Sequence, residues 1–191
     1  MSVIKLAIRK ISGLFRIRRQ EVFVCSGLEE LHERRPRIPI TIQDTSYDNV
    51  HRVTDFRNEK VEESFRRFLD QGQMGLYAIK DSQVVGHAWA IICRKKRQMA
   101  NGYFELHKGE GLIHFCNTEP SCRGQGIYQA MLVALYKRLL NEAKVERVFV
   151  DTDLDNLASI RGIQKVGFKP VGRYFYFQLR NRLIYKRNIN K

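Results

Sequence analysis

Residues 112–128 read Leu-Ile-His-Phe-Cys-Asn-Thr-Glu-Pro-Ser-Cys-Arg-Gly-Gln-Gly-Ile-Tyr. The first seven of these residues are mostly apolar and predict a strand over 112–118. A short run with two glycines, 123–126, follows, and apolar residues at helical spacing predict a strong helix over 127–143. The stretch therefore predicts a strand that passes through a glycine-containing loop directly into a helix.

The loop at 123–126 has the composition of an anion-binding turn. Gly124 and Gly126 remove side chains where a ligand would approach the backbone, and the start of the helix offers N–H groups that lack internal partners. These donors, the helix dipole and Arg123 together suit a pyrophosphate. The run lacks the Gly-Lys-Ser/Thr of a Walker loop and the third glycine of the dinucleotide fingerprint. By itself such a run is more often a plain turn with a surface arginine.

A second segment, one strand further along the chain, favours the ligand-binding interpretation. It runs from Asn156 to Phe168, and the two segments together resemble the GCN5-related N-acetyltransferase (GNAT) superfamily. The acetyl-CoA loop of that family reads [QR]-x-x-G-x-[GA], and its later motif is similar to N-x-x-[AS]-x-x-x-Y-x-K-x-G-F. The matching residues are Arg123, Gly124, Gln125 and Gly126 in the loop, and Asn156, Ser159, Lys165, Gly167 and Phe168 in the later motif. The resemblance covers about residues 75–180.

The resemblance implies an α/β fold, with a mostly antiparallel sheet that splays at the acetyl-CoA site and is flanked by helices. Acetyl-CoA would be the co-substrate, with no metal, and its pantetheine arm would lie between the strands 112–118 and 147–152. An amine would attack the thioester directly, and a backbone N–H would stabilise the oxyanion. The implied cofactor-binding residues are Cys116, Asn117, Thr118, Arg123, Gly124, Gln125, Gly126, Ile127, Tyr128 and Asn156.

Two positions depart from the family pattern. Tyr128 stands where the family usually has Gly or Ala, so its phenol must point aside or contact the ligand. Ile163 stands where a Tyr often acts as the general acid for the departing thiolate. Another group or water must then supply that proton, or the protein is not a catalyst.

The acceptor amine must be neutral to attack. Deprotonating a lysine-like amine at pH 7 costs about 4.6 kcal/mol, whereas an amine of pKa near 8 costs only about 1.4 kcal/mol. The candidate bases are His114 and Glu110, which share alternation parity with Leu112 and Cys116 if the strand extends that far back. His87 is a weaker candidate. Side chains in such positions more often have a structural role: a histidine in an apolar run is usually a satisfied core residue, and a glutamate beside two glycines is usually a solvated turn residue.

The rest of the chain alternates strands and helices. We expect strands at 38–42, 75–79, 84–93, 103–106, 147–152, 171–179 and 183–185, and helices at 58–70 and near Asn156. The basic run 94–97 reads as a solvated loop. Four cysteines without metal-ligand spacing, in a chain without a secretory signal, indicate reduced thiols in the cytoplasm.

The two ends of the chain hold most of its formal net charge of +14. Residues 1–20 and 173–191 each contain six basic residues and no acid, which leaves the body of the chain nearly neutral and makes nucleic-acid binding unlikely. Residues 1–20 show helical apolar spacing through Ile4, Ile8, Ile11 and Phe15, and form a basic amphipathic segment before a single domain at 21–191. This segment suits an anionic membrane surface, or packing on the chain itself or on a partner.

The sequence therefore predicts a cytoplasmic, acetyl-CoA-dependent N-acetyltransferase that acts on a small or carrier-linked amine. An amino sugar in polysaccharide biosynthesis is the preferred acceptor. One alternative is a membrane-associated N-acyltransferase that uses a longer acyl chain. Another is a non-catalytic module that binds CoA or a partner. The acceptor, the acyl length and the oligomeric state stay open.

Overall fold

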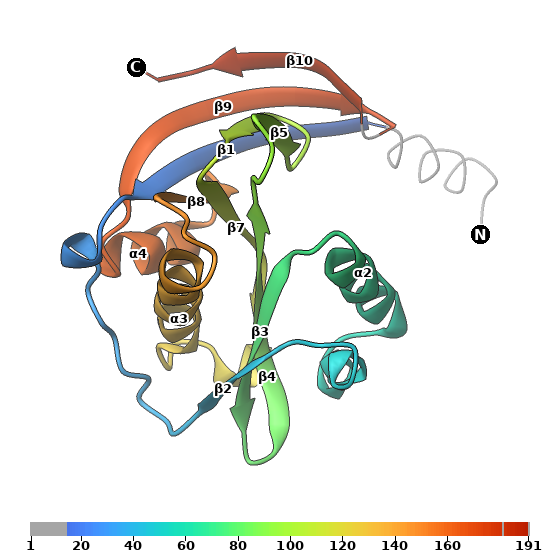
Figure 1. The fold of residues 1–191 in the computed structure, drawn as a ribbon, viewed down its shortest axis with the longest axis vertical. Coiled ribbons are helices and arrows are strands. Elements are labelled where there is room, and N and C mark those ends of the chain that lie inside the picture. Colours follow the sequence, from blue (N-terminus) through green and yellow to red (C-terminus); the bar gives the residue numbers. More distant parts are fainter. Residues whose placement is uncertain (1–14, 181, 191) are drawn as a thin grey trace.

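The computed structural model describes residues 15–180 and 182–190, which build a mixed sheet in the order β10–β9–β1–β8–β7–β4–β3–β2 (Figure 1). Neighbouring strands are antiparallel except β7 and β8, which run parallel. The strands of this sheet are β1 Phe15–Cys25, β2 Thr41–Asp44, β3 Met74–Lys80, β4 Gln83–Ile92, β7 Glu110–Thr118, β8 Arg147–Asp153, β9 Lys169–Leu179 and β10 Arg182–Asn188. The predicted α/β fold with a mostly antiparallel sheet is confirmed.

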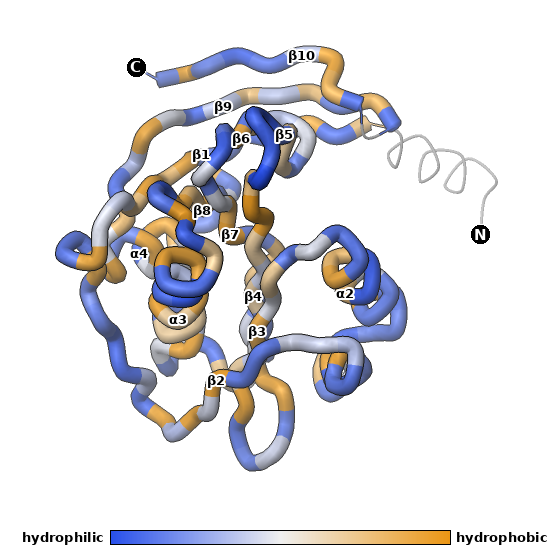
Figure 2. The backbone as a smooth tube through the Cα atoms, viewed as in Figure 1, coloured by the Kyte–Doolittle hydropathy of each residue, from blue (hydrophilic) through white to orange (hydrophobic). Residues whose placement is uncertain are grey.

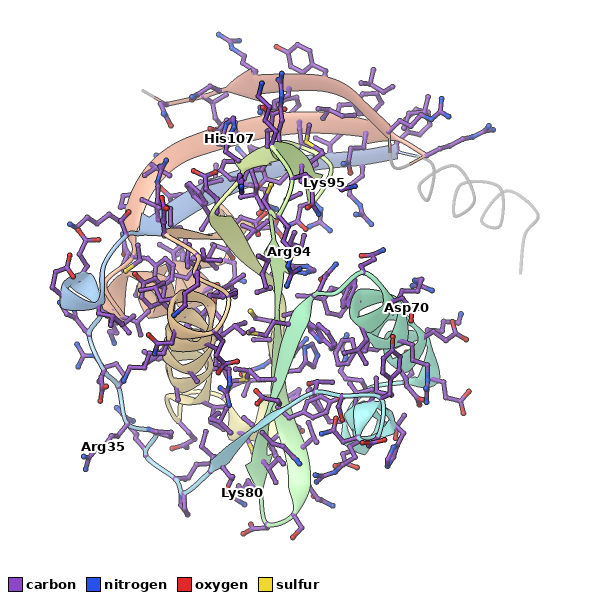
Figure 3. The ribbon with its side chains drawn as sticks, in the orientation of Figure 1. Arg35, Asp70, Lys80, Arg94, Lys95 and His107 are labelled. Carbon is purple, nitrogen blue, oxygen red and sulfur yellow. The ribbon has the colours of Figure 1, made fainter. Side chains whose placement is uncertain are left out.

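Helices cover both faces of this sheet (Figure 1). On one face lie α3 (Ile127–Asn141) and α4 (Leu157–Lys165), and on the other α2 (Glu59–Asp70) packs over β3 and β4. A separate hairpin of β5 (Arg97–Ala100) and β6 (Phe104–His107) shares the face of α2. Arg94, labelled in Figure 3, donates a hydrogen bond from Nη1 to the carbonyl of Gly72 at 3.2 Å and ties the end of β4 to the end of α2.

The period-2 alternation of the strands separates the two cores. In β7, Leu112 packs under the hairpin whereas Ile113 packs under α3. Hydrophobic residues gather in β3, β4, β7 and α3, and the outer side of α2 is hydrophilic (Figure 2). None of the helices within residues 15–180 and 182–190 is long and apolar enough to span a membrane.

Three secondary-structure expectations need correction. Residues 15–25 form β1, so Phe15 belongs to a strand and not to a helical stripe, and β1 crosses the boundary expected between residues 20 and 21. Its partners β8 and β9 lie far along the sequence, and this pairing overrides the local helical spacing.

The basic run at 94–97 leads into β5, and the strand expected at 38–42 lies at 41–44. The rest of the expected N-terminal helix lies outside the described residues.

Candidate active site

The strands β7 and β8 part in the middle of the sheet. Their parallel ladder runs from Glu110↔Arg147 to Ile113↔Val150 and ends there. Beyond this point β7 stays paired with β4, and β8 stays paired with β1. The backbone of 114–118 therefore has an edge facing β8 that β8 does not pair, as the family resemblance implied.

A β-bulge shapes β7 at the point of separation. The pairs Trp89↔His114 and His87↔Asn117 leave Phe115 and Cys116 opposite the single residue Ala88, and Phe115 has a φ of 50°. The ring Nδ1 of His87 donates to the carbonyl of Phe115 at 2.8 Å and holds the bulge. The bulge also breaks the alternation that we expected along β7: His114 lies on the α2 side, whereas Cys116 packs toward the core under α3.

The loop after β7 has the geometry of an anion cradle. Gly124 and Gly126 adopt left-handed φ values of 76° and 83°, a conformation that favours glycine, and α3 begins at Ile127. The carbonyl of Gln125 accepts from the N–H of Arg37 at 2.8 Å, which fixes the loop from behind. The N–H groups of the first turn of α3 lack intrahelical partners and can meet a pyrophosphate.

A cavity of about 1280 Å³ connects this loop with the gap between β7 and β8. Nearly all the residues that the sequence assigned to acetyl-CoA line it: Cys116, Asn117, Thr118, Arg123, Gly124, Gly126, Ile127, Tyr128 and Asn156. Gln125 is the one assigned residue that does not line the cavity, and its backbone carbonyl faces Arg37 instead. The cavity is therefore surrounded by the end of β7, the loop at 123–126 and the starts of α3 and α4.

Two polar residues link the edges of this cavity. Arg123 donates from Nε to the carbonyl of Thr118 at 3.2 Å, so its side chain folds back over the end of β7. Asn156 caps α4 by accepting from the N–H of Ser159 at 3.1 Å. The cap holds Asn156 opposite Arg123, and both residues remain at the cavity wall.

A glycine in α4, Gly162, makes room for the ring of Tyr128. The phenol hydroxyl of Tyr128 accepts from Oγ of Ser159 at 3.2 Å, and a Cβ on Gly162 would lie 3.0 Å from the ring. The tyrosine therefore points toward α4 because residue 162 has no side chain. Burial raises the pKa of Tyr128, so the phenol stays protonated. Ile163, at the usual position of the acid, is fully buried in the core.

The two sequence-predicted bases lie in different places. His114 lines the cavity, and its Nε2 donates to Oε1 of Gln73 at 2.7 Å; burial lowers the pKa of His114 to about 4. Glu110 lies at the start of β7, where it accepts from Nη1 of Arg147 at 3.0 Å and from the N–H of His107 at 2.9 Å. The structure does not bring Glu110 to the cavity, so Glu110 is not carried forward as a base.

His87 has no access to the cavity either. It is fully buried among aromatic rings, and burial lowers its pKa to about 3. Its Nε2 has no hydrogen-bond partner within the described residues. Its contact with Phe115 makes it a support of the bulge.

Sequence reasoning missed one group of cavity residues altogether. Asp151 follows the last residue of β8 that pairs with β7, and it accepts hydrogen bonds from Tyr103 and Asn101 in the β5–β6 hairpin. Other missed residues of the cavity wall share this side of the sheet: Arg16, Arg18, Gln20, Ser64, Arg67, Phe68 and Gln178. A signal was available for Asp151, because an acid interrupts the apolar strand Val-Phe-Val-Asp.

The chemistry of the cavity fits an organic co-substrate. Two positive-φ glycines, a helix start and Arg123 suit a pyrophosphate, and the unpaired edge of β7 suits an amide-containing arm. Among residues 15–180 and 182–190, no group of three or more His, Cys, Asp or Glu side chains is placed to hold a metal ion.

Comparison with solved structures shows the same fold. An acetyltransferase from the GNAT family of Colwellia psychrerythraea aligns with a TM-score of 0.61 and 13% identity over 94% of this chain and 63% of that chain. A tandem GNAT protein from the clavulanic acid biosynthesis pathway aligns with a TM-score of 0.58 and 14% identity over 100% and 60%. AAC(6')-Iy, in complex with the bisubstrate analogue CoA-S-monomethyl-acetylneamine, aligns with a TM-score of 0.55 and 17% identity over 69% and 92%.

These identities are low, and the chain spans 63% and 60% of the lengths of the first two structures. No curated protein sequence matches the chain. A family profile does match, however: that of the acetyltransferase (GNAT) family, over residues 40–168. The match includes the splayed strands, the glycine loop and the later motif through Phe168. The chain therefore belongs to the acetyltransferase (GNAT) family and is an acyltransferase.

Proposed function

We propose that this chain transfers an acetyl group from acetyl-CoA to the primary amine of a small acceptor. The observation that carries the proposal is the meeting of three features in one cavity: the parted strands β7 and β8, the loop at 123–126 and the start of α3. The amides from Gly126 to Tyr128 and the Arg123 guanidinium would hold the pyrophosphate. Charge-assisted bonds of this kind each contribute about 1.5–3 kcal/mol.

The unpaired edge of β7 would position the reactive end. The pantetheine amides would pair with backbone at Cys116, Asn117 and Thr118, in place of a neighbouring strand. Acetyl-CoA supplies the thioester carbonyl, and a backbone N–H at the bulge of β7 stabilises the oxyanion that forms when the amine attacks. Because the bulge is held by His87, this donor is fixed before the reaction.

Tyr128 is the proton donor that we propose for the departing thiolate. It lines the cavity, and the raised pKa keeps its hydroxyl protonated. The residue that usually has this function is replaced by the buried Ile163. Tyr128 reaches the same side of the site from α3, and the bond from Ser159 leaves its own hydrogen free to be donated.

An amino sugar remains the acceptor that we favour. The acceptor side of the cavity combines the aromatic rings of Phe68 and Tyr176 with Asp151 and arginines. Aromatic faces and carboxylates suit a hydroxylated amine. The bisubstrate analogue bound by AAC(6')-Iy contains an acetylneamine group, which supports this class for a protein of similar fold.

A peripheral association with anionic membranes is a second proposal. Phe15 and Ile17 in β1 are 45% and 64% exposed, and Arg19 shares their face of the strand, whereas Arg16 and Arg18 face the cavity. Exposed apolar residues beside a basic residue bind anionic lipid through burial of apolar surface and through electrostatic attraction. Flotation with phosphatidylglycerol vesicles should recover the full chain, and Ile17→Ser should weaken that recovery. Equal flotation with phosphatidylcholine vesicles, or none, would reject the proposal.

Thiol release from acetyl-CoA tests the proposed reaction. The chain is incubated with acetyl-CoA and a panel of primary amines that includes glucosamine and other amino sugars, and free thiol and N-acetyl product are both measured. Thiol release that depends on the amine and matches the product supports the proposal. Binding of acetyl-CoA without product from any amine would favour the non-catalytic alternative.

A further inference from the structure

Asp151 lies where the two central strands separate. Val150 makes the last pair with β7, and Asp151 is the next residue of β8. The backbone of Asp151 stays paired with Val22 of β1, so the strand holds its position firmly. Asp151 lines the cavity together with Cys116 and Tyr128, on the two other sides of the gap. The thioester carbonyl of the proposed reaction belongs in this gap.

The β5–β6 hairpin orients the Asp151 carboxylate. The hydroxyl of Tyr103 donates to Oδ2 at 2.6 Å, and Nδ2 of Asn101 lies 3.1 Å from Oδ2 and 3.2 Å from Oδ1. Tyr103 is itself buried and stacks on Tyr176, with ring centroids 4.4 Å apart. Oδ2 is therefore well occupied, whereas Oδ1 has only the longer contact with Asn101. The arrangement leaves Oδ1 able to accept another hydrogen.

Asp151 forms no ion pair with a basic side chain among the described residues. Its neighbour Asp153, in contrast, forms an ion pair with Arg18 at 2.9 Å. Burial raises the pKa of Asp151, and the donors Tyr103 and Asn101 oppose that rise. An ionised Asp151 in turn helps to raise the pKa of the Cys116 thiol and of the Tyr128 phenol, which line the same cavity. Charged or titratable groups elsewhere on the cavity wall are Arg16, Arg18, Arg67, His114, Cys122, Arg123, Asp153 and Tyr176.

We propose that Asp151 is the general base that takes the proton of the acceptor ammonium group. This inference rests on the proposed function. The carboxylate removes one proton from R–NH₃⁺, and the amine lone pair forms the new N–C bond to the thioester carbonyl. The C–S bond then breaks, the thiolate receives the second nitrogen proton by way of Tyr128, and Asp151 releases its proton to water. The net products are the amide, CoA thiol and one proton.

His114 is less suited to this step. It is neutral at pH 7, so it does not attract an ammonium group, and its pKa of about 4 makes it a weak base. Its Nε2 is also occupied by Gln73. The raised pKa makes the ionised Asp151 carboxylate a stronger base than an ordinary aspartate, and its charge attracts an ammonium group, which general-base catalysis favours.

Two small nucleophiles distinguish a general-base role of Asp151 from any other role of this residue. Hydroxylamine is largely unprotonated at neutral pH and needs no base, whereas ethanolamine is largely protonated and needs one. Transfer from acetyl-CoA to each probe is measured for the wild type, Asp151→Asn and the control Asp81→Asn in the exposed β3–β4 turn. Calorimetric titration with acetyl-CoA checks each variant without relying on turnover.

We expect Asp151→Asn to bind acetyl-CoA normally, to keep transfer to hydroxylamine within about threefold, and to lose about 100-fold or more with ethanolamine. Asp81→Asn should match the wild type throughout. Equal loss with both probes, or no loss, would overturn the assignment. If the wild type binds acetyl-CoA but acetylates neither probe and no amine of the panel, the proposed function fails, and the assignment fails with it.

A second variant keeps the assignment testable if Asp151→Asn does not fold. Tyr103→Phe keeps the stacked ring but removes the hydroxyl that stabilises the charged carboxylate. The pKa of Asp151 should then rise, and the acidic limb of the rate with ethanolamine should move to higher pH. An unchanged limb, with acetyl-CoA binding intact, would overturn the assignment.

Discussion

The two sides of the cavity are built in different ways. The cofactor side consists of the loop at 123–126, the start of α3 and the start of α4, and it presents mostly backbone groups. The acceptor side presents the side chains of β1, β8, β9, α2 and the β5–β6 hairpin. Backbone recognition leaves a local record of glycines and caps in the sequence. Side-chain recognition assembled from distant strands leaves no such record.

Glycines of the loop and of the later motif should therefore have the largest effects. Gly167 ends α4 with a φ of 104°, and a Cβ there would lie 1.8 Å from the carbonyl oxygen of Glu30. We expect Gly167→Ala to lower the free energy of unfolding by more than about 3 kcal/mol, since left-handed strain alone costs about 1–3 kcal/mol. Urea unfolding followed by circular dichroism measures the change.

Gly124→Ala is the matched control for that variant. Gly124 also has a positive φ, of 76°, but nothing lies within 4 Å of its added Cβ. It should show only the conformational cost, about 1–2 kcal/mol. Equal losses for the two variants would mean that the clash with the Glu30 carbonyl adds nothing to the destabilisation by Gly167→Ala.

Tyr128 connects the two sides, and its loss should affect chemistry more than binding. Tyr128→Phe should lower kcat by about 10- to 100-fold, within or just below the range for a positioned proton donor, and leave the affinity for acetyl-CoA within a few fold. Steady-state kinetics with an acceptor of low pKa measure the first quantity, and calorimetry measures the second. Ser159→Ala should have a smaller effect on kcat, because it keeps the phenol. A kcat that Tyr128→Phe does not change would remove Tyr128 as the acid.

The bulge that holds the reactive edge should make stability depend on pH. His87 has a pKa of about 3 in the folded chain and about 6.5 when unfolded, so the unfolded state binds the extra proton between these values. Its contribution to stability is present above pH 6.5 and is lost as the pH falls toward 3, by about 1.4 kcal/mol per pH unit. In His87→Gln the slope of unfolding free energy against pH should fall by that amount. An unchanged slope would contradict the buried, neutral histidine.

Glu110 should show the smallest effect on the reaction. Its contacts with Arg147 and His107 lie outside the cavity, so Glu110→Gln should lower stability by about 1 kcal/mol and leave kcat/KM unchanged. A fall in kcat/KM of tenfold or more would show that Glu110 takes part in the reaction. Thermal unfolding and acetyl transfer, measured on the same preparation, decide this.

These contrasts explain what could be predicted from the sequence. The strand–loop–helix unit and the later motif are continuous in sequence, so the sheet, the loop and this part of the cavity wall were predictable. The bulge at Phe115 was not, because no glycine or asparagine marks the position of positive φ. The same holds for β1, whose partners lie more than a hundred residues away.

Asp151 shows why the acceptor side was the harder half. Its hydrogen-bond partners Asn101 and Tyr103 lie 50 and 48 residues away, in a turn of a hairpin whose first strand was not predicted. Only the fold of β8 against that hairpin brings them together. The alternation expected along β7 also failed at the bulge, which places Cys116 on the opposite face from Leu112 and His114.

Titration with acetyl-CoA tests the central claim, that the loop and the parted strands form the cofactor site. Calorimetry would compare the wild type with Arg123→Ala and with the control Arg97→Ala in the exposed strand β5. We predict one site on the wild type, a loss of about 10-fold or more in affinity for Arg123→Ala, and no change for Arg97→Ala. No binding by the wild type, or equal affinities for all three chains, would contradict the account.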